Sequence, residues 1–124
     1  MKKILIIEDD KLLKDLLIKH LEDAGYAVFH SIDGEEGIKK ARTEKPDLIL
    51  LDLVLPGING FDLLKEIKKD SSEIKNIPVL ILSNLGQGDD IRRGIALGAE
   101  DFLIKAHYIL PEIVEKINKT LAEK

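Results

Sequence analysis

The residues best suited to chemistry in this chain follow two short hydrophobic runs. Ile4–Ile7 leads directly into Glu8 and Asp9, and Leu48–Leu51 leads directly into Asp52. Because the carboxyl ends of parallel strands share one edge of a sheet, and ligands bind in the crevice there, we expect these carboxylates to gather. Clustered carboxylates repel one another, and Mg²⁺, which prefers oxygen ligands, relieves that repulsion. The pattern therefore predicts a Mg²⁺ site.

Two further runs add a hydroxyl and an amine to the same expected edge. Val79–Leu82 is followed by Ser83, and the weaker run Phe102–Ile104 is followed by Lys105. A carboxylate can attack phosphorus and form an acyl phosphate, and phosphoryl transfer needs mainly positioning and charge neutralisation. Asp52 is then the predicted nucleophile. Lys105 would hold it before reaction and a phosphoryl oxygen afterwards, and the Ser83 hydroxyl would donate to another phosphoryl oxygen.

Strand-like and helix-like segments alternate along the whole chain. Short, continuous or alternating apolar runs predict strands, and apolar residues at helical spacing predict helices. The expected strands are Ile4–Ile7, Tyr26–His30, Asp47–Leu51, Ile77–Ser83 and Asp101–Lys105, and the expected helices are Lys11–Asp23, Gly34–Thr43, Gly60–Lys69, Asp89–Leu97 and Pro111–Ala122. Five strand–helix pairs predict an α/β fold of the (βα)5 type, with a parallel five-stranded sheet and helices on both faces.

Polar residues stand where several of these helices should begin. Asp10 is better explained as an N-cap of the first helix than as a metal ligand, and Asn59 as an N-cap that shapes the loop after Asp52. Pro111 suits the first turn of the last helix.

Composition narrows the functional classes. The 124 residues are enough for one domain, and we expect a single domain over 1–124 with no effector domain. A net charge of -4 argues against direct binding of nucleic acid. The chain has no cysteine, which excludes thiolate chemistry and fits a reducing cytoplasm. No apolar run is long enough for a signal peptide or a membrane span, so we expect a cytoplasmic protein that does not contact the membrane.

In order and spacing, these motifs resemble the response regulator receiver domain of two-component signalling, in a stand-alone form similar to the chemotaxis receiver. The resemblance extends over essentially the full length. The segments that carry it are Ile4–Asp10, Pro46–Asp52, Asp52–Gly60, Ser83 and Gly98–Lys105. The resemblance implies a flavodoxin-like, doubly wound sheet with strand order 2-1-3-4-5.

The resemblance also assigns roles around a Mg²⁺ cofactor. It implies Asp52 as phosphoacceptor and Asp9 and Asp52 as metal ligands. The Val54 backbone carbonyl would be a third ligand, and Glu8 would act through water.

A phosphorylation switch is the implied function. Ser83 would be the switch hydroxyl, Phe102 the switch aromatic that turns inward, and Lys105 the lysine that binds the phosphoryl group. The implied phosphodonor is a sensor histidine kinase, a phosphotransfer protein or a small phosphodonor. The implied output is a contact with a downstream protein through the fourth helix, fifth strand and fifth helix, and a homodimer formed on phosphorylation stays open. Such a domain assists its own phosphotransfer and dephosphorylation and is not a turnover enzyme.

Two residues depart from the family pattern on the rim opposite the acids. Ala106 stands where the family usually has a proline joined to the lysine by a cis bond, which leaves open a cis bond or a trans bond with a shifted loop. Asn84 stands where a small residue is common, and its side chain could crowd or cover the phosphoryl site. We further hypothesise that the apolar Val54 and Leu85 limit the access of water and slow hydrolysis of the acyl phosphate.

Two other functional classes compete with an active receiver. A phosphatase of the haloacid dehalogenase type also uses a strand-end aspartate and Mg²⁺, but it would carry a second aspartate where this chain has Val54. An interaction module that keeps the receiver fold without phosphorylation is the other alternative. The retained acids, Ser83 and Lys105 argue against it, whereas Asn84 and Ala106 keep it open.

Overall fold

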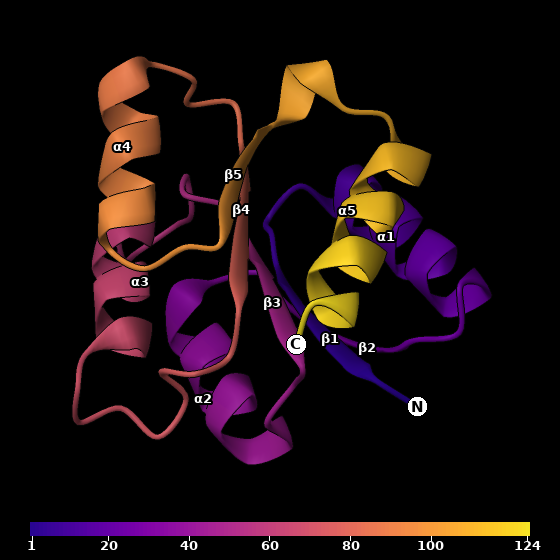
Figure 1. Cartoon of the computed structure of the whole chain (residues 1–124), viewed down its shortest axis with the longest axis horizontal. Helices are drawn as coiled ribbons and strands as arrows, with labels where there is room; N and C mark the ends of the chain where they lie inside the picture. Colours follow the sequence, from indigo (N-terminus) through magenta and orange to yellow (C-terminus); the bar gives the residue numbers. More distant parts are fainter.

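Five parallel strands form one sheet in the computed structural model, which covers residues 1–124. The strand order is β2-β1-β3-β4-β5, so the predicted order is confirmed (Figure 1). The strands are β1 (Lys3–Ile7), β2 (Ala27–Ser31), β3 (Leu48–Leu51), β4 (Val79–Ser83) and β5 (Asp101–Ile104). After β1 the chain adds β2 on one side, and then adds β3, β4 and β5 on the other side. In such folds ligands bind at this switch point, between the carboxyl ends of β1 and β3.

Helices cover both faces of this sheet, as predicted. They are α1 (Lys11–Asp23), α2 (Gly34–Glu44), α3 (Gly60–Lys68), α4 (Gly88–Ala96) and α5 (Leu110–Ala122), with a short 3-10 turn, η1 (Lys105–His107), between β5 and α5. Helices α1 and α5 lie together on one face, and α2, α3 and α4 lie on the other (Figure 1). None of these helices combines the length and the apolar character that crossing a lipid bilayer would require.

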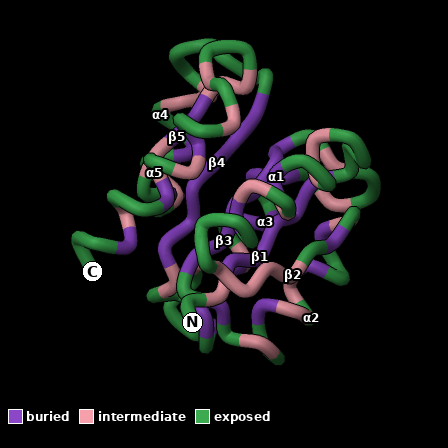
Figure 2. Tube along the Cα trace, turned by 90° about the vertical axis from the view of Figure 1, so that its right-hand side faces the viewer, coloured by how far each residue is buried: buried purple, intermediate pink, exposed green.

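The central strands are buried on both faces, as their continuous apolar sequences predict. The traces of β1, β3 and β4 are buried along most of their length (Figure 2), and their alternate residues belong to two separate cores. One core lies under α2, α3 and α4 and includes Ile7, Leu51 and Ile81; the other lies under α1 and α5. Packing on both faces holds the central strands in place, and with them the edge of the sheet where the acids lie.

Several element boundaries differ from the sequence predictions by one or two residues. β2 begins and ends one residue later, α2 runs one residue further to Glu44, α3 stops one residue earlier, and α4 is displaced by one residue toward the N-terminus. β4 begins at Val79 rather than Ile77, because Pro78 has no N–H to donate and enters the sheet only through its carbonyl, which accepts from Ile49 N.

The end of β5 is the boundary that matters for function. The prediction placed Lys105 in the strand, whereas the strand ends at Ile104 and Lys105 begins the η1 turn. Tyr108 N donates to Lys105 O at 3.3 Å and closes that turn. No peptide bond in the chain is cis, so the bond between Lys105 and Ala106 is trans.

Two predicted helix caps are confirmed. The Asp10 carboxylate accepts from Leu13 N at 3.1 Å, and the Asn59 side-chain oxygen accepts from Phe61 N at 2.8 Å. Both bonds satisfy amide groups that a helix start leaves unpaired. The Asp10 side chain is thereby committed to the start of α1.

Candidate functional site

Three carboxylates gather at the ends of β1 and β3, as their positions in the sequence predict. Glu8, Asp9 and Asp52 each offer an oxygen, and these oxygens lie within 4.8 Å of one another. β1 and β3 are hydrogen-bonded neighbours in register, with Ile7 opposite Leu51, so the residues after them leave the sheet side by side. Glu8 and Asp52 are buried and Asp9 is exposed. Three carboxylates in so small a space repel one another, and a bound cation would relieve that repulsion.

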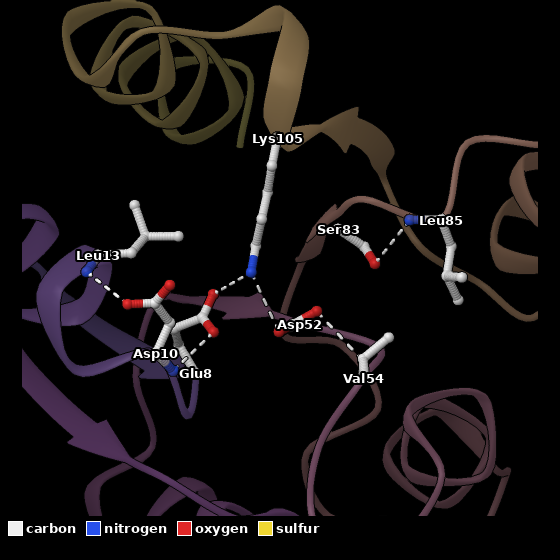
Figure 3. A network of polar contacts seen from close by, with 8 residues as sticks. All are labelled: Glu8, Asp10, Leu13, Asp52, Val54, Ser83, Leu85 and Lys105. Carbon is white, nitrogen blue, oxygen red and sulfur yellow. Dashed lines mark hydrogen bonds and ion pairs between the residues drawn. The ribbon is translucent and has the colours of Figure 1, made fainter.

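Lys105 supplies one positive charge from the other side of the cleft. Its Nζ lies 2.8 Å from Glu8 Oε1 and 3.2 Å from Asp52 Oδ2, between the two carboxylates (Figure 3). Partial burial by itself lowers the pKa of Lys105, but the hydrogen bond to Glu8 and the charge of Asp52 outweigh burial, so the pKa is raised above its ordinary value. Lys105 is therefore charged at neutral pH.

Glu8 is the most perturbed acid of the cluster. Its Oε1 accepts from Lys105, and its Oε2 accepts from Asp10 N at 3.1 Å, so both oxygens are already bonded. Burial nevertheless raises the pKa of Glu8 from 4.5 to about 7, because losing water costs the charged form more than these two bonds return. The direct ion pair with Lys105 was missed at the sequence level. The ion pair could have been predicted from the position of Glu8, because an acid that follows a buried strand is itself buried and then needs a cationic partner.

Asp52 lies at the centre of the arrangement. Its Oδ1 accepts from Val54 N at 3.1 Å, and its Oδ2 accepts from Lys105 Nζ, the contact that the sequence predicted. The loop that follows is held against the start of α3, where Gly60 N donates to Leu53 O at 3.1 Å. The carboxylate is 5% exposed, which leaves it reachable only from the cleft.

Ser83 ends β4 beside Asp52 (Figure 3). Its side chain is fully buried, and its one hydrogen bond is accepted from Leu85 N at 3.3 Å. The hydroxyl proton has no acceptor of its own in the structure. Ser83 does not line the cleft itself, but its hydroxyl proton is available for an oxygen attached to the neighbouring Asp52.

Phe102 does not start from an outward position. Its side chain is 7% exposed and belongs to the core under α2, α3 and α4. The sequence-based interpretation had this ring turning inward on phosphorylation, but in the structure it is already inside. The ring has no hydroxyl that would favour solvent, so the apolar core is its lower-energy position.

A cleft of about 450 Å³ opens onto the cluster. The residues that line it are Glu8, Asp9, Asp10, Asp52, Val54, Asn84 and Lys105. Asn84 thus borders the cleft and leaves it open, and Val54 flanks it with a side chain that is 59% exposed. Leu85 is not among the lining residues. Of the two apolar positions singled out in the sequence, Val54 is the one in place to affect water in the cleft.

The arrangement is chemically suited to a hard divalent cation. All available ligand atoms are oxygens, and one lysine cannot balance three carboxylates. Glu8 and Asp52 each accept a hydrogen bond on both oxygens, whereas the exposed Asp9 carboxylate accepts none, so Asp9 is the acid most free to ligate a cation directly. The donor set therefore fits Mg²⁺ together with retained water.

Comparison with known proteins identifies the family and agrees with the fold. The family model described as the response regulator receiver domain matches residues 4–118. Among solved structures, the receiver domain of the Francisella response regulator 1452 superposes with a TM-score of 0.90 at 28% identity, covering 99% of this chain and 98% of that one.

Curated relatives are longer regulators. The chain is 40% identical over 104 residues to the alkaline phosphatase synthesis transcriptional regulatory protein PhoP of Bacillus subtilis. It is 44% identical over 105 residues to the DNA-binding dual master transcriptional regulator RpaA of Synechocystis. The matches cover 84% and 85% of this chain but 42% and 43% of the relatives, so the chain spans less than half of their length.

Proposed function

Because the chain belongs to the response regulator receiver domain family of two-component systems, we propose that it is a Mg²⁺-dependent phosphoacceptor whose switch residue is Asp52. The observation that carries this proposal is the position of the Asp52 carboxylate. It is buried, lines a cleft, accepts a hydrogen bond from Lys105, and has an oxygen within 4.8 Å of an oxygen of Asp9.

We infer that Asp9, Asp52 and the backbone carbonyl of Val54 hold Mg²⁺, and that Glu8 acts through water. This division follows the receiver-domain family, and the exposed Asp9 carboxylate, which accepts no hydrogen bond in the structure, supports its role as a direct ligand. When bound, Mg²⁺ would neutralise charge on the phosphoryl oxygens and on the acids.

The phosphoryl transfer that we propose is a direct displacement at phosphorus. A carboxylate oxygen of Asp52 forms a bond to phosphorus while the bond to the donor breaks, and the donor atom keeps the electron pair. That donor atom is a nitrogen in a phosphohistidine or an oxygen in a small acyl phosphate. No general base is required, because an ionised carboxylate has no proton to lose.

Lys105 and Ser83 complete the proposed chemistry. Lys105 Nζ, now shared between Glu8 and Asp52, would keep its bond to Glu8 and exchange the other for a phosphoryl oxygen. The Ser83 hydroxyl, which has no acceptor for its proton, would donate to a second phosphoryl oxygen. Both groups then stabilise charge that is absent before phosphorylation.

We infer that the domain is an acceptor and not a turnover enzyme. The position two residues after Asp52, where a phosphatase of the haloacid dehalogenase type needs an acid, is occupied by the apolar Val54. The donor that we propose is a sensor histidine kinase, a phosphotransfer protein or a small phosphodonor, which implies a cytoplasmic location. The output that we propose is a contact with a protein at the surface formed by α4, β5 and α5.

Labelling with acetyl phosphate tests the acceptor directly. In the presence of Mg²⁺, the protein should gain one phosphoryl group in intact-mass spectrometry, and Asp52→Asn should gain none because an amide is not a nucleophile here. Asp70→Asn changes an exposed aspartate just beyond the end of α3; it is the matched control and should label like the parent. Full labelling of Asp52→Asn would move the acceptor to another residue.

A phosphorylation-independent interaction module is the remaining alternative, and it stays open because Asn84 and Ala106 depart from the family pattern. Isothermal titration separates the two. An active receiver should bind Mg²⁺ and should bind beryllofluoride, a phosphoryl mimic, only when Mg²⁺ is present. Mg²⁺ binding without any beryllofluoride binding would favour the interaction module.

A further inference from the structure

The ring of Phe102 is packed between β4 and α4. Phe102 and Ile81 are opposite each other in the β4–β5 pairing, so their side chains leave the same face of the sheet. Both belong to the core under α2, α3 and α4. The ring therefore has a fixed partner on the neighbouring strand.

Gly94 makes room for this ring on the helix side. A Cβ at Gly94 would lie 2.7 Å from Ile81 Cδ1 and 3.2 Å from Phe102 Cδ2, closer than side-chain atoms normally approach. The missing side chain allows α4 to lie directly over Ile81 and Phe102. The glycine, the isoleucine and the ring thus form one packing unit across α4, β4 and β5.

Nothing at the end of β4 pushes the ring out of this unit. Ser83 has a single small Oγ and no methyl group, and that oxygen is turned to Leu85 N. Phe102 has no hydroxyl that water could bind. Burial of an aromatic ring favours the inward position by roughly tenfold or more over a solvent-exposed one.

From this packing we propose that Phe102 is held inward before phosphorylation, so that the ring does not rotate when the domain is activated. The signal then leaves the site through Ser83 and the segment that joins β4 to α4. In that segment, the Ser83 Oγ is already bonded to the backbone at Leu85. This inference rests on the proposed function only for the activated state, and the ring position in the unmodified protein can be measured alone.

The ring can be observed directly by NMR, because the chain has only three phenylalanines. Phenylalanine rings and isoleucine methyls are labelled, and Phe102→Leu identifies the Phe102 signals. We expect a cross-peak between the Phe102 ring and the Ile81 Cδ1 methyl, of similar intensity without ligand and with Mg²⁺ plus beryllofluoride. A cross-peak that is absent in the free protein, or that changes severalfold on addition of beryllofluoride, overturns the proposal.

Failure of the proposed function is recognised separately in the same spectra. Beryllofluoride binding at Asp52 should shift the amide signals of Val54 and Leu85, which bond to Asp52 and Ser83. If those amides do not move, the phosphoacceptor proposal fails, whereas the cross-peak in the free protein still decides whether the ring is inward.

Two glycine variants of the same helix test the packing unit. Gly94→Ala should weaken the cross-peak severalfold or lower the melting temperature, because its Cβ meets Ile81 and Phe102. Gly88→Ala should do neither, since its Cβ meets only the flexible end of Arg92. If Gly94→Ala and Gly88→Ala behave alike, Gly94 is not what holds the ring.

Discussion

The acidic residues of the cleft are chemically different, although the sequence places them close together. Asp10 caps α1, Glu8 is bonded on both oxygens, Asp9 is exposed, and Asp52 faces the cleft from a buried position. These differences come from the neighbours of each carboxylate and not from residue type. Because burial raises the pKa of Glu8 to about 7, Glu8 is the acid whose protonation should change near neutral pH.

Glu8 should make the stability of the metal-free protein depend on pH. Between pH 4.5 and about 7 the folded state keeps a proton that unfolded Glu8 has lost, so the free energy of unfolding falls as pH rises through that range. The loss is about 3 kcal/mol, since each pKa unit corresponds to about 1.4 kcal/mol. Urea unfolding in EDTA at several pH values measures it. Glu8→Gln cannot titrate, and an equally steep pH dependence in that variant would contradict the assignment.

Val54 should control hydrolysis of the acyl phosphate more than Leu85 does. Val54 lines the cleft with an exposed apolar side chain, whereas Leu85 lies outside the lining. A polar side chain in Val54→Asn can hold water near Asp52, and we expect the phosphoryl lifetime to shorten severalfold. Leu85→Glu should shorten it less. Phosphoryl loss is followed after removal of acetyl phosphate; unchanged lifetimes in both variants would sink the idea that these residues exclude water.

At the scale of the elements, the loop between β3 and α3 is held in close contact with the start of α3. Asn59 caps α3, and Gly60 packs directly on the backbone of Leu53, the residue after the proposed phosphoacceptor. The close approach requires that position 60 carry no side chain. The start of helix α3 therefore holds the backbone of Leu53, and with it the position of the neighbouring Asp52.

Gly60→Ala should destabilise the protein by about 2 kcal/mol or more. Its Cβ would lie 2.5 Å from Leu53 O and closer still to Leu53 Cα, and a backbone neighbour cannot turn away as a side chain can. Gly86→Ala is the matched control, because its Cβ would meet only the Ile104 side chain, at 3.3 Å. Urea unfolding compares the two. Equal stabilities would show that the loop after Asp52 can shift without cost.

Element types were predicted from the sequence, but some of their ends were not. Apolar runs such as those before Glu8 and Asp52 identify strands because burial on both faces demands continuous apolar sequence. The end of β5 was placed at Lys105 because the apolar pattern does not reveal a 3-10 turn. That turn depends on the backbone bond from Tyr108 N to Lys105 O, which side-chain patterns do not encode.

For the molecule as a whole, the sheet edge concentrates negative charge that the fold must tolerate. Three carboxylates face one lysine in the cleft, in a chain whose net charge is already -4. A ligand that binds only this assembled cluster stabilises the whole domain, because the unfolded chain does not hold the three acids together.

Mg²⁺ should therefore raise the melting temperature. At a concentration about 100-fold above its dissociation constant, bound Mg²⁺ adds about 2.7 kcal/mol to the free energy of unfolding. For a domain of this size the corresponding shift is on the order of 10 °C. Asp9→Asn should melt no lower than the parent in EDTA, because it loses repulsion, and should gain little from Mg²⁺. NaCl at matched ionic strength controls for screening, and an equal shift with NaCl would mean that no site is involved.

The sequence by itself determined the alternation of strands and helices, the parallel sheet and which residues would meet at its edge, whereas the strand order 2-1-3-4-5 came from the resemblance to receiver domains. It could do so because strand periodicity and parallel pairing leave few choices for where strand ends lie. Only the tertiary structure decided which partners and how much burial each acid has. It also decided that Lys105 bridges Glu8 and Asp52 from a trans turn, and that Phe102 already lies inside. Those outcomes depend on burial and on contacts between distant segments, which arise only when the chain is folded.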